Sequence, residues 1–329
     1  MSNSNTGHKY ISRTNKDWFV VSIPASQNRT ERSISRRQLS GAIAERNRVL
    51  GYDPDQPTAD NGYLPVVHTQ LAPEMGQRLV FGALGDTHLG SKYQRLDALQ
   101  AYYTELKQRG VKTVFHTGNY IEGEASFNTH DVMVHGFENQ LDHFIQHYPM
   151  IDGITTYFVD GDDHEGWYTK REGIEVGQRL EEAAVRAGRN DLRYLGYMEA
   201  DVSIEVSGAK LLVRILHGGG GSSRAVSLAA QNIIDSYAQS ELPHILLIGH
   251  YHKSHFLPNY RGVNAIQTGT FQEQTPFMRK KKLIAALGGF AVSVTVPSNG
   301  RPRIGAEYLH YDPLAWKYQL RQEVITVEV

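Results

Sequence analysis

Five short polar segments follow one another along this chain, and four of them come directly after an apolar run typical of a buried strand. In order they are GDTHLG at 85–90, GNYIEG at 118–123, DDHEG at 162–166, HGGGG at 217–221 and GHYHK at 249–253. Loops at the carboxyl ends of buried strands bring their side chains into one crevice. Asp, His and Asn are ligand types that hold divalent metal ions. The series therefore predicts a metal-dependent enzyme.

The segments between these loops alternate between strand-like and helix-like patterns from residue 78 onward. Strands are expected at 79–84, 112–117, 155–161, 201–207, 211–218 and 244–250. Helices are expected at 93–110, 130–148, 176–189 and 225–238. This alternation predicts a largely parallel sheet covered by helices. Antiparallel strands at 264–272, 287–296 and 303–311 would form a second sheet, so the predicted fold is α/β, with two packed mixed β-sheets flanked by helices.

Residues 1–77 are predicted to be a small accessory segment in front of a 78–329 domain. Its Ser/Asn-rich start, 1–16, is expected to be disordered, followed by a short strand at 18–24, a helix at 33–54 and a linker. The helix carries several arginines, which would suit phosphate binding. A solvated helix face is the favoured interpretation, because no aromatic residues are interleaved with the arginines.

Composition narrows the function classes. Lys+Arg 34 against Asp+Glu 35 leaves a formal net charge of -1, so any nucleic-acid contact needs a local basic patch. The chain has no cysteine, which excludes disulfides, thiolate zinc sites and thiol nucleophiles. It has no apolar run long enough for a membrane span and no secretory signal pattern, which predicts a soluble cytoplasmic protein without a membrane partner.

The motif series resembles the calcineurin-like metallophosphoesterases, whose pattern runs DxH, GDxxD, GNH(D/E), H and GHxH. The match covers roughly residues 78–310, and GDTHLG is similar to the opening of DNA-repair exonucleases in that superfamily. The resemblance implies two divalent ions, with manganese favoured and iron, zinc or magnesium as alternatives. It also implies that one ion is held by Asp86, His88 and His252, and the other by His217, His250 and the third-motif residue, with the second-motif residue bridging both.

Two positions depart from that pattern. Asn119 stands where the family has a bridging Asp, and Asp163 stands where it has Asn, while Glu122 replaces the last Asp of GDxxD. In one hypothesis the two ligands have exchanged roles, so that Asp163 supplies the anionic bridge and Asn119 binds terminally through its carbonyl oxygen. In the other hypothesis the site has decayed to one metal or none. Exchange is favoured because it keeps the number of carboxylates, and hard and borderline cations need anionic oxygen. Asp162 is an alternative donor.

Two ions in one pocket would activate a bridging water and hold phosphate oxygens. By resemblance, His164 contacts the phosphate or protonates the leaving oxygen; the alternative is that it orients a ligand, with Asp86 as its neighbour. The predicted metal ligands are Asp86, His88, Asn119, Asp163, His217, His250 and His252. The predicted catalytic residues are His164 and Asp163, and the predicted substrate contacts are His164, Asn119, Gly218 and Tyr251.

The expected reaction is hydrolysis of phosphodiester bonds, with DNA as the favoured substrate. Support comes from the nuclease-like first motif, the arginine-bearing helix and basic or aromatic residues near the late motifs, including the 280–282 lysine run. Near-zero net charge argues against a polyanion. The alternatives are a phosphatase or cyclic-nucleotide phosphodiesterase acting on small phosphoesters, and a catalytically weakened metal or nucleic-acid binding protein. Fold alone does not choose among them.

Overall fold

A computed structural model describes residues 78–221, 225–297 and 300–311, together with the backbone of five short strands before residue 78. The chain divides into two compact units, Met1–Val66 and Val67–Val329. The predicted domain boundary at 77/78 falls between β5 (Thr69–Gln70) and the first long strand of the second unit.

The described part of the first unit is an antiparallel sheet. Its strands, in spatial order, are β1 (Ser4–Asn5), β2 (Ile11–Asn15), β3 (Trp18–Ile23) and β4 (Arg32–Arg36). The predicted strand at 18–24 is confirmed as β3. Disorder at 1–16 is wrong for the residues of β1 and β2, and a helix from Ser33 is wrong for β4, where the alternation of Ser33, Ile34 and Ser35 suits a strand. The remainder of that helix, 37–54, lies outside the described residues.

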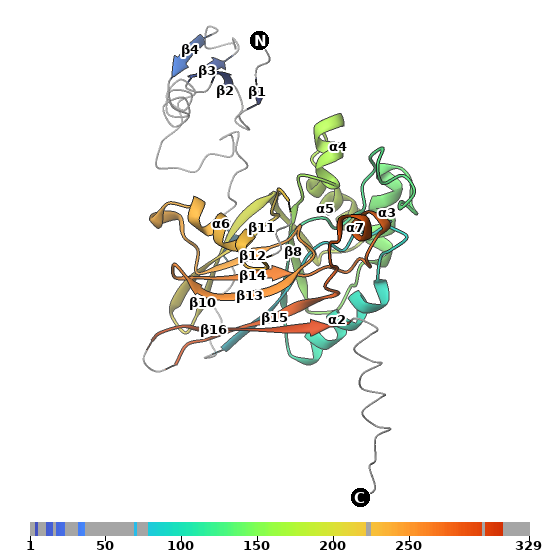
Figure 1. The fold of residues 1–329 in the computed structure, drawn as a ribbon. Helices are drawn as coiled ribbons and strands as arrows, with labels where there is room; N and C mark the ends of the chain where they lie inside the picture. Colours follow the sequence, from blue (N-terminus) through green and yellow to red (C-terminus); the bar gives the residue numbers. More distant parts are fainter. Residues whose placement is uncertain are drawn as a thin grey trace, which may run out of the picture. The chain divides into compact units, whose positions relative to one another are not determined.

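Two six-stranded sheets form the second unit (Figure 1). In spatial order, sheet I consists of β16 (Arg303–His310), β15 (Gly288–Thr295), β6 (Arg78–Leu84), β7 (Thr113–His116), β8 (Thr155–Asp160) and β9 (Leu192–Tyr197). Sheet II consists of β13 (Ser254–Tyr260), β14 (Val263–Thr268), β12 (Ile245–Ile248), β11 (Ala209–Leu216), β10 (Glu199–Val206) and β5. Both sheets contain parallel and antiparallel pairs, which confirms the prediction of two mixed sheets.

The late strands are distributed differently from the prediction. β14 pairs parallel to β12 inside sheet II, whereas β15 and β16 extend sheet I by antiparallel pairing along β6. Pairing of β15 with β6 places Phe290 opposite Ala83 and Val292 opposite Phe81, and all four side chains are buried in the core between the sheets. The alternating apolar residues of β15 pack beside those of β6 in this core, and this packing explains why β15 belongs to sheet I.

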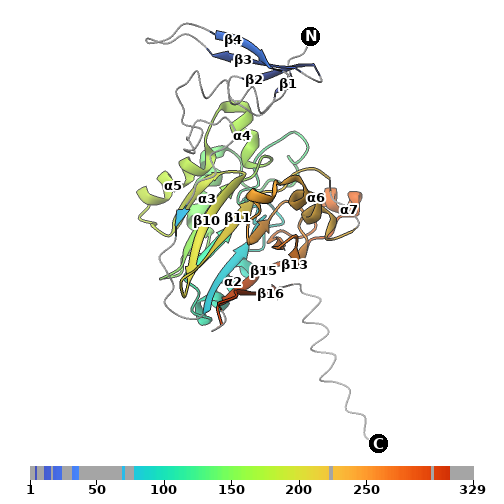
Figure 2. The same cartoon turned by 90° about the vertical axis from the view of Figure 1, so that its left-hand side faces the viewer.

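Helices cover the outer faces of both sheets (Figure 2). α2 (Leu96–Gln108), α3 (Phe137–His147) and α5 (Val176–Arg186) share one core with sheet I, and α6 (Leu228–Ser236) packs on sheet II. Two short helices, α4 (Glu165–Glu172) and α7 (Pro276–Lys281), were not predicted, nor were β9 and β13. Within the described ranges, no helix has the length and apolarity to cross a membrane.

Strand direction places the five polar loops. β6, β7 and β8 run parallel in sheet I, and β11 and β12 run parallel in sheet II. Each polar loop begins within two residues of the carboxyl end of one of these strands. Parallel neighbours present their carboxyl ends at the same edge, so the loops of each sheet lie together.

Candidate metal centre

Glycines allow the loops at the sheet edge to approach closely. A Cβ on Gly85 would lie 2.1 Å from Thr117 Oγ1, and one on Gly118, whose φ is +93°, would lie 2.7 Å from His217 Nδ1. The candidate ligands also have unusual backbones. Six site candidates are among the described non-glycine residues that have a positive φ: Asp86, His88, Asn119, His164, His250 and His252. Such backbone strain concentrates at functional sites.

The first cluster joins the DxH motif to the last histidine of the series. His88 Nε2 lies 3.2 Å from His252 Nε2, and Asp86 Oδ1 lies 3.4 Å from the His252 nitrogen and 3.9 Å from the His88 nitrogen. All three residues are buried. Ligand atoms about 2.1 Å from a shared tetrahedral ion would be about 3.4 Å apart, so this spacing fits one cation.

Protonation in the first cluster also suits a cation. Burial lowers the pKa of His88 well below its usual value, and the neighbouring His164 and His252 lower it further. Burial works against ionisation of Asp86, but His252, His217 and His88 outweigh it, so the pKa of this carboxyl is lowered. A neutral imidazole and an ionised carboxylate are the forms that bind metal.

The second cluster consists of Asp163, His217 and His250. Asp163 Oδ1 lies 3.1 Å from His217 Nε2, and its Oδ2 lies 3.4 Å from His250 Nδ1. The opposite ring nitrogens donate to backbone carbonyls: His217 Nδ1 to Thr117 at 2.8 Å, and His250 Nε2 to Gly220 at 3.0 Å. These bonds fix the tautomers and direct the remaining nitrogens toward Asp163, as outer-shell partners do for metal-binding histidines.

Opposite charges hold the second cluster together without a cation. Burial lowers the pKa of His250, but Asp163 raises it more, to about 9. Burial also opposes ionisation of Asp163, yet hydrogen bonds from His217 and His250 bring the pKa of its carboxyl well below the usual range. A metal ion here would displace protons from the imidazoles.

A single backbone contact links the two clusters. The amide of His250 donates to Asp86 Oδ2 at 2.8 Å, while Asp86 Oδ1 faces His252. The GHYHK loop therefore contributes one histidine to each cluster. Asp163 belongs to the second cluster, whereas Asp162 faces Lys170, whose Nζ lies 3.7 Å from its Oδ2. The neighbouring carboxylate is thus not the one that joins the histidines.

Asn119 presents a buried oxygen without a donor. Its Oδ1 has no hydrogen-bond partner, and a Cβ on Gly161, two residues before Asp163, would lie 2.2 Å from it. Its backbone N–H donates to Glu165 Oε2 at 3.1 Å, which holds the loop in place. A buried unsatisfied acceptor costs about 1–3 kcal/mol. A cation ligand is the chemistry that would satisfy this oxygen.

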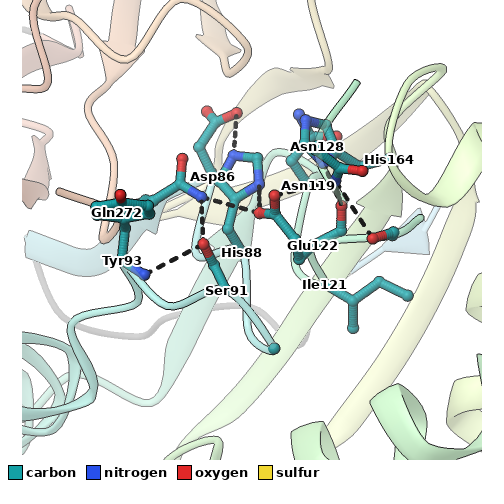
Figure 3. Close-up of polar contacts among 12 residues, drawn as sticks. Asp86, His88, Ser91, Tyr93, Asn119, Ile121, Glu122, Asn128, His164 and Gln272 are labelled. Atoms are coloured by element: carbon teal, nitrogen blue, oxygen red, sulfur yellow. Dashed lines mark hydrogen bonds and ion pairs between the residues drawn. The ribbon is translucent and has the colours of Figure 1, made fainter. Parts of the chain in front are cut away.

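Glu122 lies behind the first cluster (Figure 3). Its Oε2 is 3.3 Å from His88 Nδ1 and accepts from Gln272 Nε2 at 2.9 Å. Its Oε1 accepts from Asn128 Nδ2 at 3.1 Å. The preserved charge at this motif position was the sequence signal for Glu122, but no pattern pointed to Asn128 or Gln272. A carboxylate behind a ligand histidine orients the ring and raises its basicity.

His164 lies at the edge of both groups. Its Nδ1 donates to the Glu122 carbonyl at 2.5 Å, and its ring centroid is 4.3 Å from that of His88. This bond leaves Nε2 as the nitrogen that can exchange a proton with a ligand. In the alternative hypothesis, in which His164 orients a ligand, its hydrogen-bond partner is the Glu122 backbone and not Asp86.

The two remaining substrate candidates differ in position. Tyr251 lines a cavity of about 660 Å³ together with members of both clusters. Gly218 lies under the Tyr251 ring, where a Cβ would approach to 2.8 Å.

His116 is buried beneath the loops, with Nε2 3.1 Å from Thr87 Oγ1. His130 and His135 are exposed and lie outside this cavity lining.

Comparisons with known proteins give structural likeness only. No family model matches the sequence, and no curated protein matches it. Vps29 of Chaetomium thermophilum shares 13% identity and a TM-score of 0.31, over 71% of this chain and 98% of that one. GAP50, the anchor in the inner membrane complex of Plasmodium, shares 14% identity and a TM-score of 0.39, over 71% of this chain and 84% of that one. A 5'-nucleotidase of Candida albicans shares 10% identity and a TM-score of 0.34, over 77% of this chain and 55% of that one. Similarities this low carry no argument about the chemistry.

Proposed function

We propose that this chain is a metal-dependent phosphoesterase that hydrolyses phosphodiester bonds, with DNA as the favoured substrate. The observation that carries the proposal is the pair of His/carboxylate clusters, linked through Asp86 and His250, beside one cavity. The spacing of both clusters suits divalent cations, and in the first cluster the lowered pKa values of His88 and Asp86 suit them as well. Two neighbouring ions lower the pKa of a water nucleophile and neutralise charge on a phosphate undergoing in-line displacement.

Each cluster contributes different ligands in this proposal. Asp86, His88 and His252 hold one ion through a fully buried set. Asp163, His217 and His250 hold the other, and Asn119 adds its neutral oxygen. Asp163 supplies the anionic oxygen that the second motif lacks, which is the exchange of roles expected from the sequence.

His164 is the proposed acid. Its Nδ1 donates to the Glu122 carbonyl, so Nε2 is the nitrogen that faces away from this bond, and acid catalysis through it would require the doubly protonated ring. General acid catalysis of this kind contributes typically about 10²–10⁴-fold. Tyr251, on the cavity wall, is a proposed substrate contact; its hydroxyl donates to Gly219 O at 2.8 Å, which fixes the ring.

A substrate panel with manganese and with chelator tests the proposal. Single- and double-stranded DNA, RNA, cyclic nucleotides and phosphomonoesters would be compared, with Asp86→Asn as the inactive control. We expect hydrolysis of DNA only with metal. Turnover of small phosphoesters that DNA fails to inhibit would favour a phosphatase or cyclic-nucleotide phosphodiesterase. Substoichiometric metal with no hydrolysis of any substrate would contradict the enzyme assignment and favour a binding protein.

A further inference from the structure

Three aromatic side chains from separate segments meet on the wall of the cavity that also contains the metal-ligand candidates. They are Phe127, Trp167 of α4 and Phe277 of α7, here called the aromatic shelf. Phe127 lies edge-on to Trp167, with centroids 5.1 Å apart, and 6.2 Å from Phe277. Nothing in their sequence spacing groups these residues, so the fold alone brings them together.

The shelf is unusually exposed for apolar rings. Phe127 is 63% exposed and Phe277 is 49% exposed. Among the exposed large apolar side chains of the described ranges, these two are the aromatic ones, and both belong to the shelf. Exposed apolar surface gathered at one place marks a binding site more often than a scattered residue does. The rings contribute little to the core, so a ligand is the better explanation of their grouping.

The shelf continues directly into the proposed active site. The Trp167 ring lies 4.4 Å from the His164 ring, centre to centre, at an interplanar angle of 31°. His164 in turn lies 4.3 Å from His88. A planar group that packs on the shelf would therefore lie next to His164, the proposed acid. One substrate molecule could then place such a group on the shelf and its phosphate at the metal-ligand candidates.

Positive charge accompanies the rings. Lys281 lines the cavity, with Nζ 6.0 Å from the centre of the Phe277 ring. The last turn of α7 also carries Arg279 and Lys280. The lysine run at 280–282 thus begins beside an exposed ring. Aromatic platforms with neighbouring cations are the usual means of binding single-stranded nucleic acid, because each base stacks while the backbone is neutralised.

We propose that the aromatic shelf binds an unstacked nucleobase next to the scissile phosphate, so that the substrate is single-stranded nucleic acid. This inference rests on the proposed phosphodiesterase function and adds its strand preference. In a duplex the faces of internal bases are covered by their neighbours and are not available for stacking. The cavity volume of about 660 Å³ is within the usual range of pockets for small ligands.

The first test compares two polymers of equal length with the double variant Phe127→Ala/Phe277→Ala. One is oligodeoxythymidylate, and the other is an oligomer of abasic tetrahydrofuran phosphates. Stacking is worth about 1–3 kcal/mol per base, so the variant should lose about 5–150-fold in kcat/KM on the first polymer. The abasic polymer should be cleaved equally by both proteins. Equal losses on both polymers, or no loss on either, would overturn the proposal.

Two variants control for indirect effects. Phe127→Tyr/Phe277→Tyr keeps both rings and should retain the activity on oligodeoxythymidylate. Met150→Ala removes another exposed apolar side chain, 60% exposed, that does not line the cavity, and should change neither polymer. A full loss in the tyrosine variant would show that packing, not ring stacking, explains the alanine result.

A binding measurement separates this inference from the function. With Trp18→Phe and Trp316→Phe in place, Trp167 is the remaining tryptophan of three, and its fluorescence is followed with chelator present. Thymidine monophosphate should quench it, whereas deoxyribose 5-phosphate should not. Quenching without any hydrolysis would refute the phosphodiesterase function but support nucleobase binding by the shelf. Hydrolysis without quenching would support the phosphodiesterase function but refute nucleobase binding by the shelf. Tighter binding of a phosphotyrosine peptide than of thymidine monophosphate would also overturn the nucleobase assignment.

Discussion

The two metal-ligand clusters hold the same kinds of side chain in different surroundings. In the first, the side chains of Asp86 and His88 are 0% and 1% exposed, and the ring nitrogens face one another. In the second, the Asp163 side chain is 30% exposed and that of His250 is 20% exposed, and both histidines face the carboxylate. The first cluster is the more buried of the two, and the second is held by ion pairs between one carboxylate and two histidines.

This contrast shows how the motif changes are accommodated. The residues of the first cluster match the family pattern that the sequence resembles, and their side chains are more buried than those of Asp163 and His250. Both altered positions, Asn119 and Asp163, contribute to the half-open side. A carboxylate can be relocated there because Asp163 lies between two histidines whose other nitrogens are tied to carbonyls. The exchange hypothesis gives Asp163 the bridge between the ions, and the side chains that Asp163 contacts are the two histidines of the second cluster.

The largest expected effect is on Asp163. Asp163→Asn should reduce metal-dependent hydrolysis by about 10³-fold or more, because the second cluster loses its anionic ligand. The matched variant Asp162→Asn alters a neighbouring carboxylate that faces Lys170, and should stay within a fewfold of the wild type. Activity is measured as kcat/KM with manganese, and metal content by atomic absorption.

The double variant Asn119→Asp/Asp163→Asn sharpens the same comparison. If the two residues have exchanged roles, returning the carboxylate to the second motif should recover part of the lost activity. A folded double variant as inactive as Asp163→Asn would refute simple exchange. Circular dichroism and thermal unfolding establish that both variants are folded.

The next effect concerns the first cluster alone. Glu122→Gln removes the negative charge behind His88, and loss of such an outer-shell partner typically weakens metal binding about 10–100-fold. Glu124→Gln is the matched control, since Glu124 pairs with the exposed His135 instead. Manganese titration by calorimetry should show one weakened site and one unchanged site. Equal weakening of both sites would show that the clusters are not independent.

Proton competition should also separate the clusters. Asp163 raises the pKa of His250 to about 9 in the metal-free protein, so below that pH a metal ion must displace a proton. Asp163 also raises the pKa of His217 against the effect of burial, so affinity at the second cluster should fall at least tenfold for each unit of pH lost between about pH 8 and pH 6. Burial keeps the pKa of His88 low, so that histidine adds no such dependence to the first cluster. Calorimetry that found identical pH slopes for both sites would contradict this difference.

The smallest effect is structural. Tyr120 donates its hydroxyl to Asp160 Oδ1 at 2.7 Å, beneath the loop that carries Asp163. Tyr120→Phe leaves a buried carboxylate short of one donor, which should lower the free energy of unfolding by about 1–3 kcal/mol. Urea unfolding measures this loss. Manganese affinity should stay the same at both clusters, and a weakened second cluster would mean that Asp160 also positions the ligands.

Local sequence was sufficient to predict which polar side chains the fold brings together, but not their surroundings. Each polar loop follows a strand, so strand patterns and motif spacing together placed Asp86, His88, His217, His250 and His252. The same reasoning favoured Asp163 and kept Asp162 as an alternative, and the contacts with the histidines of sheet II are made by Asp163. That reasoning could not find Asn128 or Gln272 behind Glu122, since both come from distant loops.

Sheet membership and the aromatic shelf were beyond sequence patterns for the same reason. The late strands read as one antiparallel group, yet β14 joins sheet II and β15 joins sheet I, a choice made by packing against Ala83 and Phe81. Phe127, Trp167 and Phe277 have no common spacing, and α7 was not predicted. Contacts between distant segments decide these features.

The central claim, that two cations bind side by side in one pocket, is tested most directly by anomalous diffraction from crystals grown with manganese. Two peaks are predicted, one among Asp86, His88 and His252 and one among Asp163, His217 and His250, with Asn119 Oδ1 adjoining the second. No peak at either cluster, or a single peak at saturating manganese, would contradict the claim.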